Sequence, residues 1–459
     1  MTVRETRARA LGPGLVAVAL LSAVIGSVGA PLITSVATGF GVSLAAAQWT
    51  LTVTLFSGAI TAPLLGRLGA GQHRRPTMLA TLALVALGGA VAALPLPFAA
   101  LLIGRGLQGL GLGVAPLLMS VARDRLSEQR ATSVIATISV ASTVGIGVGY
   151  PLIGLLDQLA GLRAAYGLGL ALSLAALWIA WRVIPSDPPG ASVRIDVAGA
   201  ILLAVGIFGV LLVIAQPEVW RLPIAGAGVL VLAGIALTGW MAVERRVPSP
   251  LVDPRQLTVP NVLRANVAML LAGAGMYLLF SLLTRFLQTP AGAGYGFALP
   301  GLAAGAALIP FSVLGFVAGR LAPRILARAS AEWAYIGAVV AVAVSAGVFA
   351  LGRDSLLAVL AAMAVLGAGV GGVSALMPQL VLTGVQRAET ASVLSINQIV
   401  RSIGFSMGSA LAGLLLASST PSGALLPDRD GYALAALWAG PLLLASIVPV
   451  LTLRGHRAR

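Results

Sequence analysis

The sequence contains no cysteine, no lysine and only two histidines among its 459 residues. Without cysteine there is no disulfide, thiolate metal site or iron–sulfur cluster. His73 and His456 lie among arginines near the ends of apolar segments, so a histidine-based metal or haem site is not expected. An H-E-x-x-H zinc motif and a Walker phosphate loop are also missing. We therefore expect no metal and no cofactor.

Charged residues are also scarce. They make up 9% of the chain, whereas hydrophobic residues make up 58%. A soluble domain carries roughly 25% charged residues. A chain of this length could not cover so much apolar surface in water, so lipid must solvate much of it. Long continuous apolar runs favour helices over the short alternating strands of a barrel, and we expect an all-α membrane protein.

The net charge of +15 would suggest nucleic-acid binding in a soluble protein. Here, however, all 29 basic residues are arginines scattered through short segments between apolar runs. This scatter is typical of a membrane protein that marks its cytoplasmic side with positive charge. We expect a lipid bilayer around the protein and no nucleic acid as a partner.

The gaps between charged residues predict fourteen membrane-spanning helices. A span needs roughly 17–25 mostly apolar residues. Residues 10–66 carry no charge, which leaves room for two spans that are separated near Gly39–Ser43. Two other spans each contain one charge, Arg105 or Arg401. The expected helices cover 12–34, 47–66, 77–96, 99–121, 133–155, 164–184, 197–217, 222–243, 262–284, 298–321, 333–352, 355–384, 390–417 and 431–453.

Arginine is distributed unevenly between the two sides of this arrangement. With the N-terminus inside, 22 arginines lie in cytoplasmic segments, five lie outside and two lie within spans. The asymmetry predicts a multi-pass protein of the cell membrane with both termini in the cytoplasm. The first 34 residues also resemble a signal peptide. We expect them to be retained, because their removal would leave an odd number of helices that no longer fits the arginine pattern.

Two short segments match enzyme signatures by letter. Gly404–Gly408 fits G-x-S-x-G, and Gly367–Gly372 fits G-x-G-x-x-G. Both signatures need a strand that turns sharply into a helix. Each segment lies inside a long apolar span instead, so we interpret both as chance matches and expect no enzyme activity.

The segment 66–75 resembles the signature G-x-L-a-D-r-x-G-r-[KR] between helices 2 and 3 of the major facilitator superfamily. Ala70 stands at the family's Asp, and His73 stands at its second Gly. The resemblance implies that this loop belongs to a cytoplasmic gate. The matching residues are Gly66, Leu68, Arg74 and Arg75.

The fourth predicted helix carries the most complete match. Residues 101–111 resemble the family motif l-x-x-x-R-x-x-q-G-x-g, and every specified position is present. The resemblance implies that Arg105 lines the central path and organises the gate and a proton relay. Gln108 lies on the same helix face, three residues later. The alternative is a buried arginine held by backbone carbonyls. Arg105 cannot carry the proton itself, because arginine does not deprotonate in proteins.

The fifth predicted helix resembles the glycine-rich, proline-containing motif of exporters in this superfamily. Tyr150 replaces the Gly before Pro151, and Leu155 replaces the last Gly. Glycines four residues apart let helices approach closely, and proline removes a backbone hydrogen bond. We therefore expect a moving helix interface here. The residues that match are Gly145, Gly149, Pro151 and Gly154.

The second half is similar to the fourteen-helix drug/proton antiporter branch of the superfamily, in the segments 248–257, 285–288 and 397–404. The resemblance implies the major facilitator fold, with 6+2+6 transmembrane helices in two pseudo-symmetric bundles. It divides the chain into a six-helix bundle, a two-helix insert and a second six-helix bundle. The Asp and Asn usual in helix 1 of this branch are Ser22 and Ser27 here. The three parts are 1–190, 191–250 and 251–459.

Arg401 shares one face of the thirteenth helix with Asn397 and Gln398. These residues line a substrate cavity or form a structural network between helices, and both interpretations stay open. No acid lies in the middle of a predicted span, whereas Arg105 and Arg401 would make the cavity positive. We therefore expect neutral or anionic substrates, because a buried unpaired cation is costly. Asp157, just past the fifth helix, is the candidate proton carrier, with a simple loop carboxylate as the alternative.

The function that we expect is a secondary active transporter that exports small amphipathic, drug-like compounds in exchange for protons. An importer of a nutrient or small anion on the same fold is the alternative. A membrane enzyme or a channel is disfavoured, because the sequence shows no nucleophile–base or metal constellation and no filter-like loop within a span. The expected partners are a small-molecule substrate and protons, and the expected state is a monomer.

Overall fold

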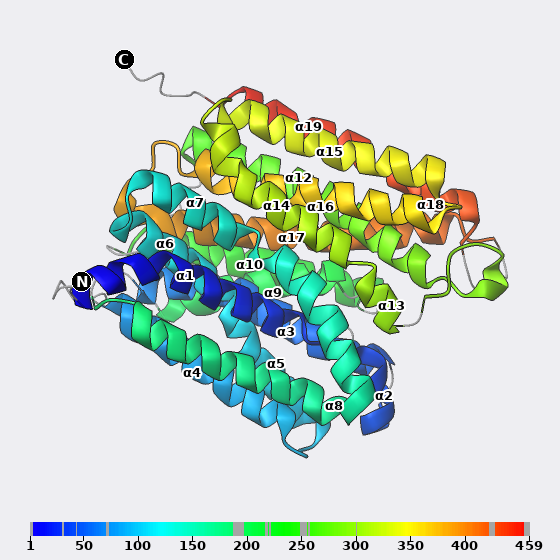
Figure 1. Ribbon diagram of the computed structural model, residues 1–459, viewed down its shortest axis with the longest axis horizontal. Helices are drawn as coiled ribbons and strands as arrows, with labels where there is room; N and C mark the ends of the chain where they lie inside the picture. Colours follow the sequence, from blue (N-terminus) through cyan, green and yellow to red (C-terminus); the bar gives the residue numbers. More distant parts are fainter. Residues whose placement is uncertain are drawn as a thin grey trace.

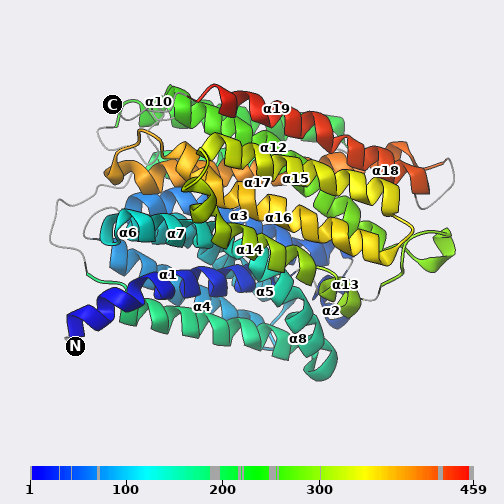
Figure 2. The same cartoon turned by 45° about the horizontal axis from the view of Figure 1, so that its top comes forward.

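The computed structural model describes residues 3–29, 32–42, 44–69, 73–186, 197–215, 219, 222–247, 255, 258–299, 301–421 and 427–453. Long helices run side by side along the molecule, and α1 begins at the same end at which α19 finishes (Figures 1 and 2). We call this the arginine-rich end, because Arg74, Arg125 and Arg182 lie at helix ends there, and we call the opposite end the arginine-poor end.

In the first group of helices, α8 packs against both α1 and α4. α5 packs against α3 and α4, and it continues through a 3-10 turn into α6. The members are α1 (Val3–Ser27), α2 (Ile33–Phe40), α3 (Leu44–Leu68), α4 (Arg74–Ala93), α5 (Phe98–Gly109), η3 (Leu110–Val114), α6 (Ala115–Arg125), α7 (Glu128–Ser139) and α8 (Ala141–Val183).

The second group of helices is built around α12, which packs against α16, α17 and α19. α16 also packs against α14 and α15. The members are α12 (Pro260–Gln288), η5 (Ala291–Ala293), α13 (Gly301–Ala306), α14 (Ile309–Leu326), α15 (Ala331–Gly352), α16 (Leu356–Val381), η6 (Arg387–Glu389), α17 (Thr390–Ser418), α18 (Arg429–Leu437) and α19 (Ala439–Leu451).

Two further helices, α9 (Val197–Ala215) and α10 (Pro223–Glu244), pack on each other beside these groups. α9 contacts α3 of the first group and α17 of the second through an apolar cluster that includes Phe56, Ile207 and Ile396. The pair therefore covers the seam between the groups on one side. The predicted domain boundaries near residues 190 and 250 lie outside the described residues, and the division into three parts stays a prediction.

Eleven helical stretches in the described parts of the chain are long and apolar enough to cross a membrane. Two more, Trp49–Ala62 and Ala198–Ile214, are apolar but shorter. One of the eleven, Thr143–Val183, spans 41 residues and is broken at Gly161. Gly161 has φ 82°, a left-handed conformation that glycine adopts without steric cost. This stretch thus contains two predicted spans. All fourteen predicted ranges overlap helices, although the ranges 133–155, 298–321 and 431–453 are each interrupted by a short turn.

Two predicted boundaries are wrong. The range 12–34 is not one helix, because α1 stops at Ser27 and α2 begins at Ile33. Asp157 does not follow the end of the fifth helix but lies on α8, which continues to the break at Gly161. The position of the break has a local cause, because residues 155–160 contain neither glycine nor proline.

Glycine makes the closest helix contacts in the second group. A Cβ atom at Gly367 or Gly371 of α16 would collide with backbone atoms of α14, and one at Gly408 would collide with α12. These positions belong to the two enzyme-like letter matches. Both matches lie inside helices, α16 and α17, and lack the strand and turn that the enzyme motifs require. Their glycines serve close packing of helices.

Candidate functional site

Arg105 is fully buried in α5, where it joins three helices. Nη1 donates hydrogen bonds to Gln108 Oε1 at 2.7 Å and to the backbone oxygen of Ile25 at 3.3 Å. Nη2 donates to the backbone oxygen of Gly26 at 3.4 Å, and Nε donates to that of Thr50 at 3.3 Å. The arginine is therefore held by backbone carbonyls of α1 and α3. Its role in gating stays a prediction.

Two buried polar groups near Arg105 lack a hydrogen bond of good geometry, namely the Tyr166 hydroxyl and Gln108 Nε2. Tyr166, on α8, interacts electrostatically with both Arg105 and Asp157. Asp157 accepts a hydrogen bond of 2.5 Å from the hydroxyl of Ser35 on α2. Arg105 and Gln108 are thus in direct contact, and Tyr166 interacts with both Arg105 and Asp157. Sequence reasoning missed Tyr166, which stands out only as a tyrosine in an apolar span.

The predicted gate loop contributes an ion pair within the first group. Arg74 Nη1 lies 2.7 Å from Asp124 Oδ2 at the end of α6. Arg75 donates hydrogen bonds to the hydroxyl of Ser186 at 3.0 Å and to the backbone oxygen of Trp181 at 2.9 Å. These contacts fasten the start of α4 to the ends of α6 and α8.

The other matched residues of this loop lie at the end of α3. Gly66 and Leu68 belong to its last turn, and the Leu68 carbonyl accepts a hydrogen bond of 3.0 Å from the Thr77 hydroxyl. This bond links α3 to α4 across the loop. Ala70, which replaces the family's Asp, lies outside the described residues.

Arg123, beside this loop, connects the two groups of helices. Nη1 donates to Thr390 Oγ1 at 2.6 Å, and Nη2 donates to the backbone oxygen of Val385 at 3.1 Å. One helix turn further along α17, the hydroxyl of Ser395 donates to the backbone oxygen of Ala62 in α3 at 2.9 Å. Hydrogen bonds therefore hold the groups together at the arginine-rich end. Sequence reasoning did not select Arg123, although it directly precedes Asp124.

The glycine motif on α8 mainly faces α1, within the first group. A Cβ atom at Gly145 would collide with Ala23, and one at Gly149 would collide with the side chain of Ser27. Ser27 also donates a hydrogen bond of 3.1 Å to the backbone oxygen of Gly145. A Cβ atom at Gly154 would meet no other atom within 4 Å. Gly145 and Gly149 are therefore packing positions against α1, and Gly154 is open.

The contact of α8 with the second group lies at Gly147 and Pro151. A Cβ atom at Gly147 would collide with Ser312 of α14, whose hydroxyl donates a 2.5 Å hydrogen bond to the backbone oxygen of Thr143. A Cβ atom at Gly305 of α13 would lie 3.3 Å from the nitrogen of Pro151. The contact between the two groups is thus made by Gly147, which lies between the matched residues Gly145 and Gly149. Helix periodicity alone does not reveal which of these glycines faces the second group.

The polar residues of α17 divide into two roles. Asn397 donates a 2.9 Å hydrogen bond to the side chain of Asn266 in α12, which is a structural link between helices. Arg401 Nη2 donates to Gln398 Oε1 at 2.5 Å. Asn397, Gln398 and Arg401 together line a cavity of about 20 Å³, which the first group lines with Met119 and Ser139, among others. Such a cavity has room for about one water molecule.

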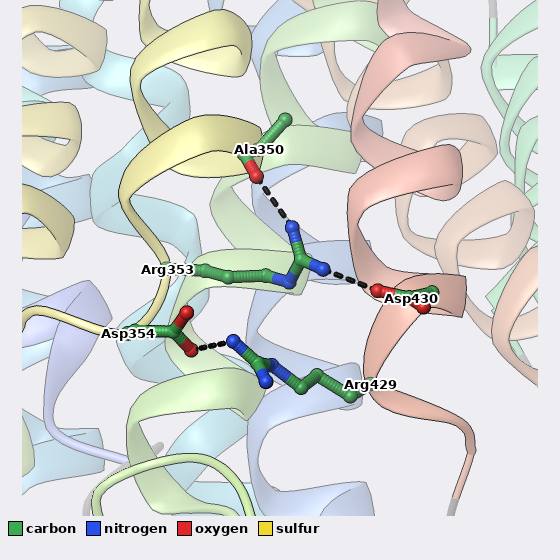
Figure 3. Close-up of polar contacts among 5 residues, drawn as sticks. All are labelled: Ala350, Arg353, Asp354, Arg429 and Asp430. Carbon is green, nitrogen blue, oxygen red and sulfur yellow. Dashed lines mark hydrogen bonds and ion pairs between the residues drawn. The ribbon is translucent and has the colours of Figure 1, made fainter.

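The arginine-poor end of the second group carries two ion pairs (Figure 3). Arg353 pairs with Asp430 and donates a 2.6 Å hydrogen bond to the backbone oxygen of Ala350. Arg429 pairs with Asp354. The pairs connect the turn between α15 and α16 with the start of α18. Each of the four charged side chains is paired with another of the four, so this cluster holds helices in place and offers no free charge to a ligand.

Comparison with known proteins places these features in context. A sequence profile of the Major Facilitator Superfamily matches residues 15–409. The chain is 28% identical over 437 residues to a cephamycin export protein of Amycolatopsis lactamdurans, covering 91% of this chain and 87% of that protein. It is 27% identical over 400 residues to a multidrug resistance protein B homolog of Mycobacterium tuberculosis, covering 82% and 70%.

A solved structure shares the arrangement of helices. The human organic anion transporter MFSD10 aligns with a TM-score of 0.66 at 17% sequence identity, covering 96% of this chain and 99% of that one. At this identity the likeness concerns the fold. The profile match extends from α1 to α17 and so includes both groups of helices.

Proposed function

The chain belongs to the major facilitator superfamily, and on that basis we propose that it exports small amphipathic compounds from the cell by secondary active transport. Membership makes the protein a multi-pass membrane transporter of small molecules rather than an enzyme. The direction of transport is our inference. It is supported by the relatives over most of the chain that are named as export or multidrug resistance proteins.

The observation that carries the proposal is the cavity between the two groups of helices. Both groups line it, and the second group places the guanidinium of Arg401 there. Hydrogen bonds from Arg123 join the groups on the arginine-rich side of this cavity. A cavity between two groups of helices that contains a guanidinium and is closed at one end by breakable contacts suits transport by alternating access.

We further propose that the arginine-rich end faces the cytoplasm, because short cytoplasmic loops are enriched in arginine. Arg123 and the predicted gate residues Gly66, Leu68, Arg74 and Arg75 would then form the inner gate. In this orientation the conformation described here is closed toward the cytoplasm.

Proton coupling is proposed to depend on Asp157. This carboxylate lies near Tyr166, which also interacts with Arg105. Uptake of a proton by Asp157 would change the charge next to this buried network. It would thereby change the preferred position of α8 relative to α1 and α5. Arg105 would stay protonated throughout and act as a fixed charge.

The test is transport in inverted membrane vesicles that contain the protein. We expect uphill accumulation of neutral or anionic amphipathic compounds when the vesicle interior is acidified, and loss of accumulation when the pH gradient is dissipated. Empty vesicles are the control. Movement of a nutrient or small anion only toward the cytoplasmic face would instead establish an importer, and movement of no compound in either direction would refute transport of this class.

A further inference from the structure

Aromatic side chains continue from Arg401 along the second group of helices. The Cζ atom of Arg401 lies 5.9 Å from the centre of the Phe405 ring, one helix turn away. Phe405 stacks on Tyr277 of α12, with ring centres 5.0 Å apart and an angle of 23° between planes. Tyr277 contacts Phe280 at 5.5 Å between centres. A cation therefore lies at one end of a row of aromatic rings.

The first group contributes another aromatic residue to this row. Tyr150 of α8 lies close enough to Tyr277 to interact with it electrostatically. Both side chains are half-buried, and within the described part of the chain neither hydroxyl forms a hydrogen bond. Tyr150 occupies the position at which the resembled exporter motif has glycine. Two hydroxyls without a hydrogen-bond partner among the described residues, one from each group of helices, thus lie within electrostatic range of each other.

Arg401 also has unused hydrogen-bonding capacity. Gln398 is its one hydrogen-bond partner among the described residues, and no described carboxylate forms an ion pair with it. A guanidinium carries five N–H donors in a planar fork that matches a carboxylate. A half-buried cation without a counter-ion is costly, and an anionic ligand would remove that cost.

We propose that Arg401, Gln398, Phe405, Tyr277 and Tyr150 form a binding subsite for an aromatic carboxylate. The guanidinium of Arg401 binds the carboxylate, the rings of Phe405 and Tyr277 pack on the aromatic body, and the two tyrosine hydroxyls donate hydrogen bonds to polar substituents. This assignment rests on the proposed transport function and narrows its substrate class. A ligand in this position contacts α8 as well as α12 and α17, and so bridges the two groups of helices.

The subsite is tested by equilibrium binding to the purified protein in lipid nanodiscs. The probes are radiolabelled 2-naphthoate and its neutral isostere 2-naphthamide. A hydrogen bond to a charged group contributes roughly 1.5–3 kcal/mol, so naphthoate should bind about tenfold or more tightly than naphthamide. Arg401→Gln should abolish this preference and leave naphthamide binding unchanged. Phe405→Leu should weaken both probes alike.

Arg264→Gln is the matched control, because Arg264 binds the backbone oxygen of Thr452 at an exposed helix end and should not affect the preference. Tyr150→Phe and Tyr277→Phe remove only a hydroxyl, so they should reduce the preference for 6-hydroxy-2-naphthoate over 2-naphthoate, and they test the site even if Arg401→Gln does not fold. Equal binding of both probes to the wild type, or an unchanged preference in Arg401→Gln, would overturn the subsite. Binding needs no gradient, so the subsite and the transport function can fail separately. Export of neutral compounds alone would refute the subsite and leave the proposed exporter intact. Binding of naphthoate without transport would refute the exporter and leave the subsite intact.

Discussion

At the scale of single residues, Arg105 uses all three guanidinium nitrogens to join α5 to α1 and α3. Lysine would supply three donors from one point and could not reproduce this planar arrangement. We therefore predict that Arg105→Lys and Arg105→Ala both insert into the membrane but lose at least about nine-tenths of transport, a loss that costs roughly 1.4 kcal/mol or more. Initial rates in vesicles, normalised to the amount of protein, give the answer. Full transport by Arg105→Ala would leave this arginine only a structural role.

Arg123 links the two groups of helices at the arginine-rich end through Thr390 and Val385. Its removal should favour opening at that end by about tenfold, because hydrogen bonds to charged groups contribute roughly 1.5–3 kcal/mol. The sequence has no cysteine, so Ser139→Cys in the cavity lining provides a single labelling site. We predict faster reaction of this cysteine with an impermeant thiol reagent, applied from the arginine-rich side, when Arg123→Ala is added.

The control for this labelling is Arg182→Ala, since Arg182 stacks on Trp178 and Trp181 of its own helix and does not join the groups. Equal labelling rates with and without Arg123→Ala would show that Arg123 does not hold the gate.

Protonation of the Asp157 carboxylate can be tested separately from its hydrogen bond to Ser35. In Asp157→Asn the side-chain oxygen can still accept the hydrogen bond from Ser35, but the residue no longer ionises. We predict that Asp157→Asn loses pH-gradient-driven transport and keeps passive exchange of substrate. Ser35→Ala, which retains the carboxylate, should keep the response to the gradient. An intact gradient response in Asp157→Asn would exclude this residue as the proton carrier.

At the scale of helices, α8 separates two kinds of glycine contact. Gly147 lies against Ser312 of the second group, whereas Gly149 lies against Ser27 of α1 in the first. We predict that Gly147→Leu abolishes transport, because a larger side chain wedges the two groups apart. Gly154→Leu should retain at least about half of the activity, since its Cβ meets open space. Vesicle transport and thermal unfolding should be measured together for both variants.

Gly149→Leu, which the exporter motif points to, would disturb packing between α8 and α1 and so should lower stability as well as transport. Normal transport by Gly147→Leu would show that the contact between α8 and α14 does not need to change during the cycle.

At the scale of the whole molecule, the arginine distribution predicts fourteen spans with both termini in the cytoplasm. Reporter fusions at residues 124–130 and 250–256 should read cytoplasmic, and a fusion at 422–430 should read external. The fusions sample both groups of helices and the connection between them. A C-terminus on the external side would contradict this topology and with it the assignment of Arg123 to an inner gate.

The sequence by itself determined the membrane class and the positions of the helices. Solvation by lipid acts locally, since each stretch of roughly 20 residues must satisfy its own backbone and avoid charge. Gaps between charges therefore located most of the long apolar helices. The end of the fifth helix was misplaced because the chain stays helical until Gly161, the first position there that readily adopts a left-handed turn.

Only the tertiary structure decided which polar residues meet. Arg123 binds Thr390 across 267 positions of sequence, and Ser312 binds Thr143 across 169. Neither contact follows from helix periodicity, which states the face on which a residue lies but not the helix opposite that face. The same reason hid Tyr150 and Tyr277, which lie on different helices and come together only when the two groups pack. Local physical chemistry placed the helices in the membrane, and their packing assembled the site.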